Sequence, residues 1–219
     1  MLPSSFWQNR DIYFKKVALL LTHLGDRSIP RKTLTLVGNP VVSTLVSKFG
    51  KGSWYFNGNT CTIQSPSLEL LNRSFSIEFW ILLSENASTI QVIATTYNIS
   101  GAQVGTFILY RHTNNTISVN SAFGPIVTSS PLLLNQWYFV RMTYKHSPSP
   151  STTSLFINNV LQGTGNISIT AQANKFHVGG SQGDGNLFNQ WFKGYLESFR
   201  VTLDITRNEK VPQKLFPYS

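Results

Sequence analysis

Apolar and polar side chains alternate along most of this 219-residue chain. A period of two is typical of β-strands that bury one face. A continuous apolar run at residues 17–24 is short and ends before Gly25, which favours a buried strand over a helix. No stretch shows an amphipathic helical stripe, and only residues 206–213 leave room for a short helical turn. The alternation predicts further strands at residues 33–37, 53–56, 60–64, 74–83, 106–111, 116–120, 137–145, 154–158, 176–180 and 194–203.

Turn-forming residues separate the predicted strands. Gly58 lies between two asparagines, and Asn158-Asn159 separates two apolar arms. Both sequences predict hairpin turns, because Gly and Asn tolerate the left-handed backbone conformation of a tight turn. Residues 145–153, with two prolines, predict a surface loop inside a hairpin, and residues 179–190 predict a long Gly/Asn-rich loop.

Strand signals recur at hairpin spacing throughout, and no linker or charge run marks a boundary. We therefore expect a single all-β sandwich domain at residues 16–219, preceded by a short N-terminal arm of residues 1–15. Aromatic side chains on a free arm usually mark a contact with another protein. The predicted assembly contact comprises Phe6, Trp7, Arg10, Lys15 and Lys16.

The composition adds a positive field concentrated near the N-terminus. The formal net charge is +9, and eight of the 18 Lys and Arg residues fall within residues 1–51, beside only two acids. Such a field attracts nucleic acid, an anionic polysaccharide or an acidic protein surface, or it only keeps the chain soluble. Nucleic acid is the weakest of these partners, because no strand face combines aromatic and basic side chains as single-strand binders do.

Cysteine and histidine usage excludes two common kinds of site. The single cysteine, Cys61, rules out an intramolecular disulfide, and the four histidines show no zinc-ligand spacing. Cys61 alternates with Ile63, which indicates a small core residue rather than a nucleophile. No apolar run approaches the length of a membrane span, and the N-terminus lacks the apolar stretch of a signal peptide. We therefore expect a chain made in a host cytoplasm without a secretion signal.

Several stretches, in this order and spacing, resemble laminin G-like domains of the concanavalin A-like lectin/glucanase type. The resemblance covers roughly residues 11–217 and looks closest to versions carried by bacteriophage virion proteins and bacterial surface proteins. It implies a jelly-roll sandwich of two antiparallel sheets that often binds glycans or proteins and often needs calcium. The stretches are residues 17–26 (VALLLTHLGD), 47–58 (SKFGKGSWYFNG), 75–81 (FSIEFWI), 135–163 (NQWYFVRMTYK to SLFINNVLQG) and 176–202 (FHVGG to FKGYLESFRVT).

Departures from the family pattern weaken the implied calcium site. The final core strand commonly carries Asp-Glu-x-Arg, and here Glu197 to Arg200 read Glu-Ser-Phe-Arg. The family hairpin commonly ends in Asp-Gly, and here Asn57 precedes the glycine. Calcium prefers several oxygen ligands that include charged carboxylates. Asp184 and Asn186 supply two oxygens without a third ligand nearby in sequence, so we expect no metal or other cofactor.

Glu78 is a candidate catalytic residue, because glucanases of this fold cleave glycosidic bonds with two carboxylates. Only Glu78 and Glu197 lie in the middle of predicted strands, and no cluster such as Glu-x-Asp-x-x-Glu is present. Strict alternation places Ser76, Glu78 and Trp80 on one face, and Leu196, Ser198 and Arg200 on one face of another strand. If these strands are neighbours, Glu78 and Arg200 form a structural ion pair. A paired carboxylate with a lowered pKa is a poor general acid.

A binding surface is expected instead at the long loop of residues 179–190. Asp184, Asn186 and Asn189 offer hydrogen bonds beside Trp191, whose ring either stacks on a sugar or packs in the core. The resemblance implies such aromatic and polar combinations in sugar sites of this fold.

Three functions follow from these observations. The first is a non-enzymatic virion module, such as a head-decoration, tail or fibre protein, which contacts other virion proteins and anionic host-surface polysaccharide as part of a larger assembly. The second is a free carbohydrate-binding lectin, and the third a polysaccharide hydrolase.

Overall fold

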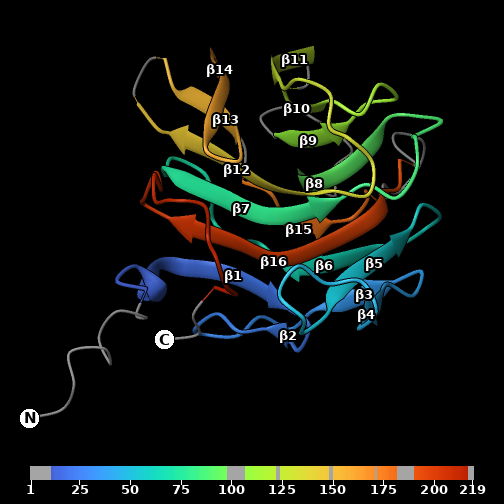
Figure 1. The fold of residues 1–219 in the computed structure, drawn as a ribbon. Helices are drawn as coiled ribbons and strands as arrows, with labels where there is room; N and C mark the ends of the chain where they lie inside the picture. The colour runs from blue at the N-terminus through green and yellow to red at the C-terminus, as the bar shows by residue number, and fades with distance from the viewer. Residues whose placement is uncertain are drawn as a thin grey trace, which may run out of the picture.

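The alternating pattern builds two antiparallel β-sheets packed face to face (Figure 1). The computed structural model describes residues 11–97, 107–121, 124–147, 150–170, 172–181 and 190–216. The expected all-β, two-sheet antiparallel sandwich is confirmed. Among the described residues, no helix is long and apolar enough to cross a membrane.

The larger sheet, sheet A, contains nine strands and carries the Glu78 strand at its centre. β7 (Phe75–Leu82) lies between β12 (Trp137–Lys145) and β16 (Lys193–Leu203). Outside these lie β13 (Thr152–Ile157), β14 (Val160–Asn166), β1 (Val17–Thr22) and β2 (Gly25–Asp26), while β5 (Ser53–Asn57) pairs with β16 and β4 (Val41–Ser43) with β5.

The smaller sheet, sheet B, contains seven strands. From β11 to β8 its neighbouring strands are consecutive in sequence, whereas from β8 to β3 they are not. The strands are β11 (Gly124–Thr128), β10 (Ile117–Ser121), β9 (Ile108–Arg111), β8 (Gln91–Tyr97), β15 (Lys175–Val178), β6 (Thr62–Pro66) and β3 (Thr35–Val37).

The main core fills the space between the sheets. Phe79 stacks on Phe199 with ring centroids 5.2 Å apart, and Cys61 is fully buried, as predicted. Burial raises the pKa of the Cys61 thiol and so keeps it protonated. A second apolar cluster lies on the outer face of sheet A, beneath the segment that runs back from β16 across β7 and β1 (Figure 1). Its buried members are Phe14, Val17, Leu20, Trp80, Phe139 and Phe216.

Two local predictions are wrong. The turn at Gly58 is not a hairpin, because β5 belongs to sheet A and β6 to sheet B, so the turn carries the chain between sheets. Residues 206–213 form no helix. The Asn158-Asn159 hairpin is confirmed: both residues have positive φ, 50° and 68°, and they join β13 to β14.

A β-bulge changes the expected face of residues in β16. The register shifts between Glu197 and Arg200, and Ser198 at the bulge has φ 52°. Leu196 therefore points into the core while Arg200 lies opposite Glu78 on the outer face. Strict alternation had placed Leu196 and Arg200 on the same face, which is wrong.

The sandwich also includes part of the segment that the sequence assigned to an arm. Phe14 is buried in the outer apolar cluster, and the Asp11 carboxylate is only 5% exposed. The 3-10 helix η2 (Phe14–Lys16) leads directly into β1. Of the expected arm, Asp11 and Phe14 thus pack on the sandwich, and Phe6, Trp7 and Arg10 lie outside the described residues.

Candidate functional site

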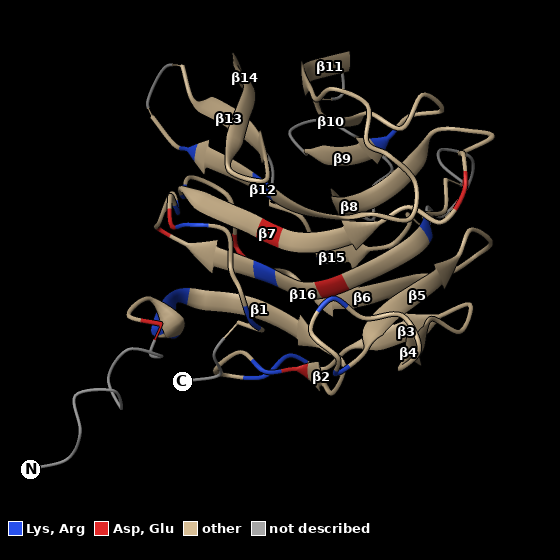
Figure 2. Cartoon of the chain, in the orientation of Figure 1, with Lys and Arg blue, Asp and Glu red and all other residues tan. Residues whose placement is uncertain are grey.

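Glu78 lies in a buried ion network on the outer face of sheet A. Arg200 donates two hydrogen bonds to Glu78 Oε2, from Nε at 3.0 Å and Nη2 at 2.5 Å. Arg200 Nη1 also donates to Asp11 Oδ2 at 2.9 Å, and Arg207 donates to both oxygens of the same carboxylate. In Figure 2 the acidic position of β7 lies next to a basic position of β16. With Glu78 1% exposed, the pair predicted from sequence is present and faces no open cleft.

Glu197 is held just as firmly by a different segment. Its carboxylate accepts hydrogen bonds from the hydroxyl of Ser47 at 3.0 Å and from the backbone N–H groups of Lys48 and Phe49 at 2.6 and 3.2 Å. Burial raises the pKa of Glu197, although these hydrogen bonds act in the opposite direction. The carboxylate is 2% exposed and anchors the loop between β4 and β5.

The predicted binding loop is described only at its edges. Asp184, Asn186 and Asn189 lie outside the described residues. Trp191 is 8% exposed and forms a bridge with Val92, and a Cβ added to Gly180 would lie 2.4 Å from the indole ring. The ring is therefore packed against backbone, and it offers no open face on which a sugar could stack.

The described residues do not provide the set of oxygen ligands that the calcium site implied by the resemblance would need. No group of three His, Cys, Asp or Glu side chains gathers in these parts of the chain. Asn57 Oδ1 accepts a hydrogen bond from the N–H of Asn59 at 2.8 Å, so it serves its own turn.

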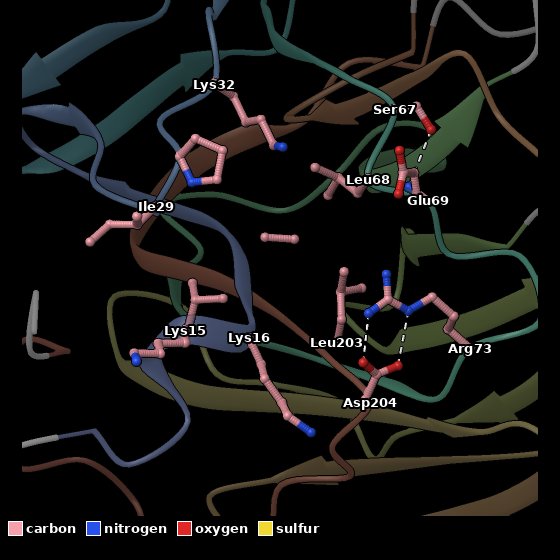
Figure 3. A pocket seen from close by; sticks show the side chains of 13 residues that line it. Lys15, Lys16, Ile29, Lys32, Ser67, Leu68, Glu69, Arg73, Leu203 and Asp204 are labelled. Carbon is pink, nitrogen blue, oxygen red and sulfur yellow. Dashed lines mark hydrogen bonds and ion pairs between the residues drawn. The ribbon is translucent and has the colours of Figure 1, made fainter.

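A pocket of about 340 Å³ lies where four segments meet (Figure 3). This volume is within the range of small-molecule sites, near its lower end. The segments are η2 with the start of β1, the loop after β2, the connection between β6 and β7, and the end of β16. The lining residues are Lys15, Lys16, Val17, Ala18, Ile29, Pro30, Lys32, Ser67, Leu68, Glu69, Arg73, Leu203 and Asp204.

One wall of this pocket is an ion pair. Arg73 donates to Asp204 from Nε at 2.9 Å and from Nη2 at 2.6 Å, which is a bidentate geometry. The Arg73 guanidinium holds the pKa of Asp204 below its usual value through these hydrogen bonds. Glu69 also acts on Arg73 electrostatically, so both carboxylates of the pocket lie on the Arg73 side.

The remaining sides of the pocket carry three lysines, of which Lys16 lies close enough to Asp204 to lower the pKa of that carboxyl electrostatically. Lys15 and Lys16 are exposed on η2, and Lys32 is half-buried in the loop after β2. Within the described residues, no carboxylate lies within ion-pair distance of these three ammonium groups. Lys15 and Lys16, which the sequence predicts to belong to an assembly contact, also line this pocket.

Asp26 fixes the loop that presents Lys32. The buried Asp26 carboxylate accepts hydrogen bonds from the N–H groups of Leu20, Ser28 and Lys32 at 3.0, 2.9 and 2.6 Å, and from the Ser28 hydroxyl at 2.7 Å. In Figure 3 the Lys32 side chain extends toward the hollow from this loop. The backbone that carries Lys32 is therefore fixed before any ligand binds.

Comparison with known families identifies the domain. Residues 57–207, more than half of the chain, match the family described as the concanavalin A-like lectin/glucanases superfamily. The chain belongs to this superfamily. No curated protein sequence matches it.

Solved structures share the fold of this concanavalin A-like domain at low sequence identity. Domain 4 of AbnA, a GH43 extracellular arabinanase from Geobacillus stearothermophilus in complex with arabinotriose, is 16% identical with TM-score 0.58, covering 85% of this chain and 92% of that one. A Trypanosoma rangeli sialidase mutant is 12% identical with TM-score 0.62, and the match covers 90% of this chain but 31% of the sialidase. A botulinum neurotoxin type C structure is 14% identical with TM-score 0.59, with 90% and 49% covered.

Proposed function

We propose that this domain is a non-catalytic carbohydrate-binding module and that its saccharide site is the pocket between η2, the loop after β2, the β6–β7 connection and β16. The observation that carries the proposal is the lining of the pocket, which combines charged hydrogen-bonding groups with apolar surface. Arg73 and Glu69 supply donors and acceptors for hydroxyl groups, and Leu203 and Ile29 supply apolar contact. Ligand sites commonly join a few placed polar groups to an apolar wall in this way.

The two mid-strand carboxylates support a binding role over hydrolysis. A glycosidase needs a pair of carboxyl groups that flank the scissile bond. Glu78 is bound by Arg200, Glu197 is bound by the loop at residues 47–49, and both are almost completely buried. Neither carboxylate has access to a substrate in this arrangement.

The structural neighbours support the class of ligand. The AbnA domain was solved in complex with arabinotriose, and cell entry of botulinum neurotoxin type C depends on two ganglioside molecules. These proteins share only the fold with this chain, and because the match covers about a third to a half of some of them, their whole activities are not transferred.

A glycan array followed by NMR tests the proposal. The purified chain should bind a subset of saccharides, and the ligand should shift the backbone resonances of Lys32, Ser67 and Arg73. A reducing-sugar assay on the same saccharides should show no cleavage. Absence of binding to any saccharide would refute the proposal, as would cleavage that is lost in both Glu78→Gln and Glu197→Gln.

We propose in addition that the module works on a virion, with residues 1–10 as its attachment segment. The aromatic side chains of Phe6 and Trp7 and the charge of Arg10 support the idea, and so does the position of the segment next to Asp11, which is fixed in the sandwich. A free lectin would bind the same glycans without belonging to a particle. Detection of the chain in purified virions decides between the two.

A further inference from the structure

We infer that the pocket selects an anionic saccharide, one that carries a carboxylate or sulfate group, and that Lys32 and Lys16 bind this group. The inference rests on the proposed glycan-binding function and adds the ligand's charge. Its basis is the uneven distribution of charge around the hollow, because four cations and two carboxylates line it.

Both carboxylates of the lining lie near the Arg73 guanidinium, and the four cations still leave the hollow with a net positive charge. Asp204 is held by the bidentate hydrogen bonds of Arg73, and Glu69 acts on the same guanidinium. None of the three lysines lies within ion-pair distance of a carboxylate among the described residues, although Lys16 acts on Asp204 electrostatically. A net positive hollow lined in part by apolar groups attracts an anion more strongly than a flat, solvated surface with the same charge would.

The two lysines differ in how firmly they are placed. The backbone of Lys32 is fixed by the Asp26 carboxylate, and Figure 3 shows its ammonium group directed toward the hollow. Lys16 follows the buried Phe14 on η2, and its N–H donates to the carbonyl of Tyr13 at 2.8 Å. Lys16 is exposed, and its charge also acts on Asp204, so Lys32 should contribute more to affinity.

A saccharide suits this site better than a bare anion does. Leu68, Leu203 and Ile29 line the hollow beside the lysines, and Ile29 is 66% exposed. Bare sulfate or phosphate has no apolar face to cover these groups, whereas a sugar ring presents C–H groups to them and hydroxyls to Glu69. The ring and its acidic substituent together fill both parts of the pocket.

Matched pairs of saccharides test the inference by isothermal titration calorimetry. Each pair shares one skeleton and differs in charge: oligogalacturonate against its methyl ester, a sialylated oligosaccharide against the desialylated form, and a sulfated one against the desulfated form. We expect at least one acidic member to bind about tenfold tighter than its neutral counterpart. Its affinity should fall several-fold as NaCl rises from about 50 to about 500 mM, because exposed charges are screened.

Three variants locate the charge effect. Lys32→Ala should weaken binding of the acidic member about tenfold, and Lys16→Ala should weaken it less, while neither changes binding of the neutral member by more than about twofold. Lys51→Ala is the matched control, because Lys51 is an exposed lysine that does not line the pocket. Thermal melts should show all three variants folded, since surface lysines outside an ion pair contribute little to stability.

Different failures point to different conclusions. Equal binding of acidic and neutral members, unchanged in Lys32→Ala, would overturn the anionic selectivity and leave the glycan-binding module intact. Inorganic sulfate that binds as tightly as the acidic saccharide would overturn the saccharide as the ligand. No binding to any member, together with an empty glycan array, would refute the proposed function itself.

Discussion

Buried charges in this domain are stabilised by two different kinds of partner. Arg200 is paired with the carboxylates of Glu78 and Asp11, whereas Arg111 is surrounded by neutral oxygens. Arg111 is fully buried and donates to the side chains of Gln91 and Asn115 and to the carbonyls of Glu85 and Lys193. Burial lowers the pKa of Arg111 to about 10, so the guanidinium stays charged at neutral pH. The residue acts as a clamp between loops that are distant in sequence.

Arg111→Met should therefore be strongly destabilising. The substitution removes four hydrogen bonds, one to the buried side chain of Gln91 and three that are partly buried, and we expect the free energy of unfolding to fall by about 3 kcal/mol or more. Urea unfolding measures the change. Arg31→Met is the control, because Arg31 is exposed and its loss should cost less than about 0.5 kcal/mol. A loss below about 1 kcal/mol in Arg111→Met would contradict the clamp.

His177 should make the domain sensitive to acid. Burial, with a smaller contribution from the charge of Lys175, lowers the pKa of His177 to about 4, against about 6.5 in an unfolded chain. Between these two values the unfolded chain binds a proton that the folded chain does not, so stability falls as the pH drops from about 6.5 to about 4. The loss from this group is at most about 3 kcal/mol.

The comparison of wild type with His177→Gln isolates this effect from other titrating groups. Urea unfolding at pH 7 and at pH 5 should show a larger loss for wild type than for the variant. If the two proteins lose equal stability between these pH values, His177 does not titrate in the predicted window.

At the scale of elements, alternation found the strands that bury one face and missed others for physical reasons. β8 carries apolar residues on both faces, because Val92 packs with Ile108 and Tyr110 on the side opposite the core. β11 begins Gly-Pro and β14 contains two glycines, and both compositions obscure a strand. Periodicity also says nothing about which sheet a strand joins, so the crossing at Gly58 looked like a hairpin.

The pocket, like the crossing between the sheets, could be predicted only in part from the sequence. Charge distribution pointed to the basic N-terminal region and included Lys15 and Lys16 among the contact residues. The Arg73–Asp204 pair joins two segments that are 131 residues apart in the sequence. Only the fold of both sheets brings that pair close to Lys32. No local pattern marks such a pocket.

A substitution at Gly179 tests how tightly the two sheets pack at their junction. Its φ is +85°, and a Cβ there would lie 1.9 Å from the ring of Phe56. The Gly179 N–H donates to the carbonyl of Ile93, and its carbonyl accepts from the N–H of Phe192. Gly179→Ala should destabilise the domain by about 3 kcal/mol or more, because both the backbone and the aromatic ring must shift.

Thermal unfolding measures this effect, with Gly50→Ala as the control. Gly50 also has positive φ, +73°, but an added Cβ meets nothing within 4 Å. That variant bears only the backbone strain, about 1 kcal/mol. Equal melting temperatures for the two variants would show that the contact with Phe56 is not the cause.

At the scale of the whole molecule, the two ends of the described chain close over the same face of sheet A. Asp11 joins Arg200 to Arg207, Arg207 Nη1 pairs with Glu209 at 2.9 Å, and Phe216 lies beneath Arg200, 3.7 Å from guanidinium carbon to ring centroid. The network thus ties the start of the chain to the segment after β16. Any attachment segment that precedes Asp11 begins from a fixed point on a rigid sheet.

Two deletions separate attachment from folding. Removing residues 1–10 should leave the melting temperature within about 2 °C of the full chain, while incorporation into particles is lost. Removing residues 1–15 also takes away Asp11 and Phe14, so the buried Arg200 and Arg207 lose the carboxylate that they share and the outer apolar cluster is opened. We expect that longer deletion to cost about 3–5 kcal/mol. Full incorporation of the shorter deletion would refute the attachment role, and an unchanged melting temperature in the longer one would show that the network contributes little to the fold.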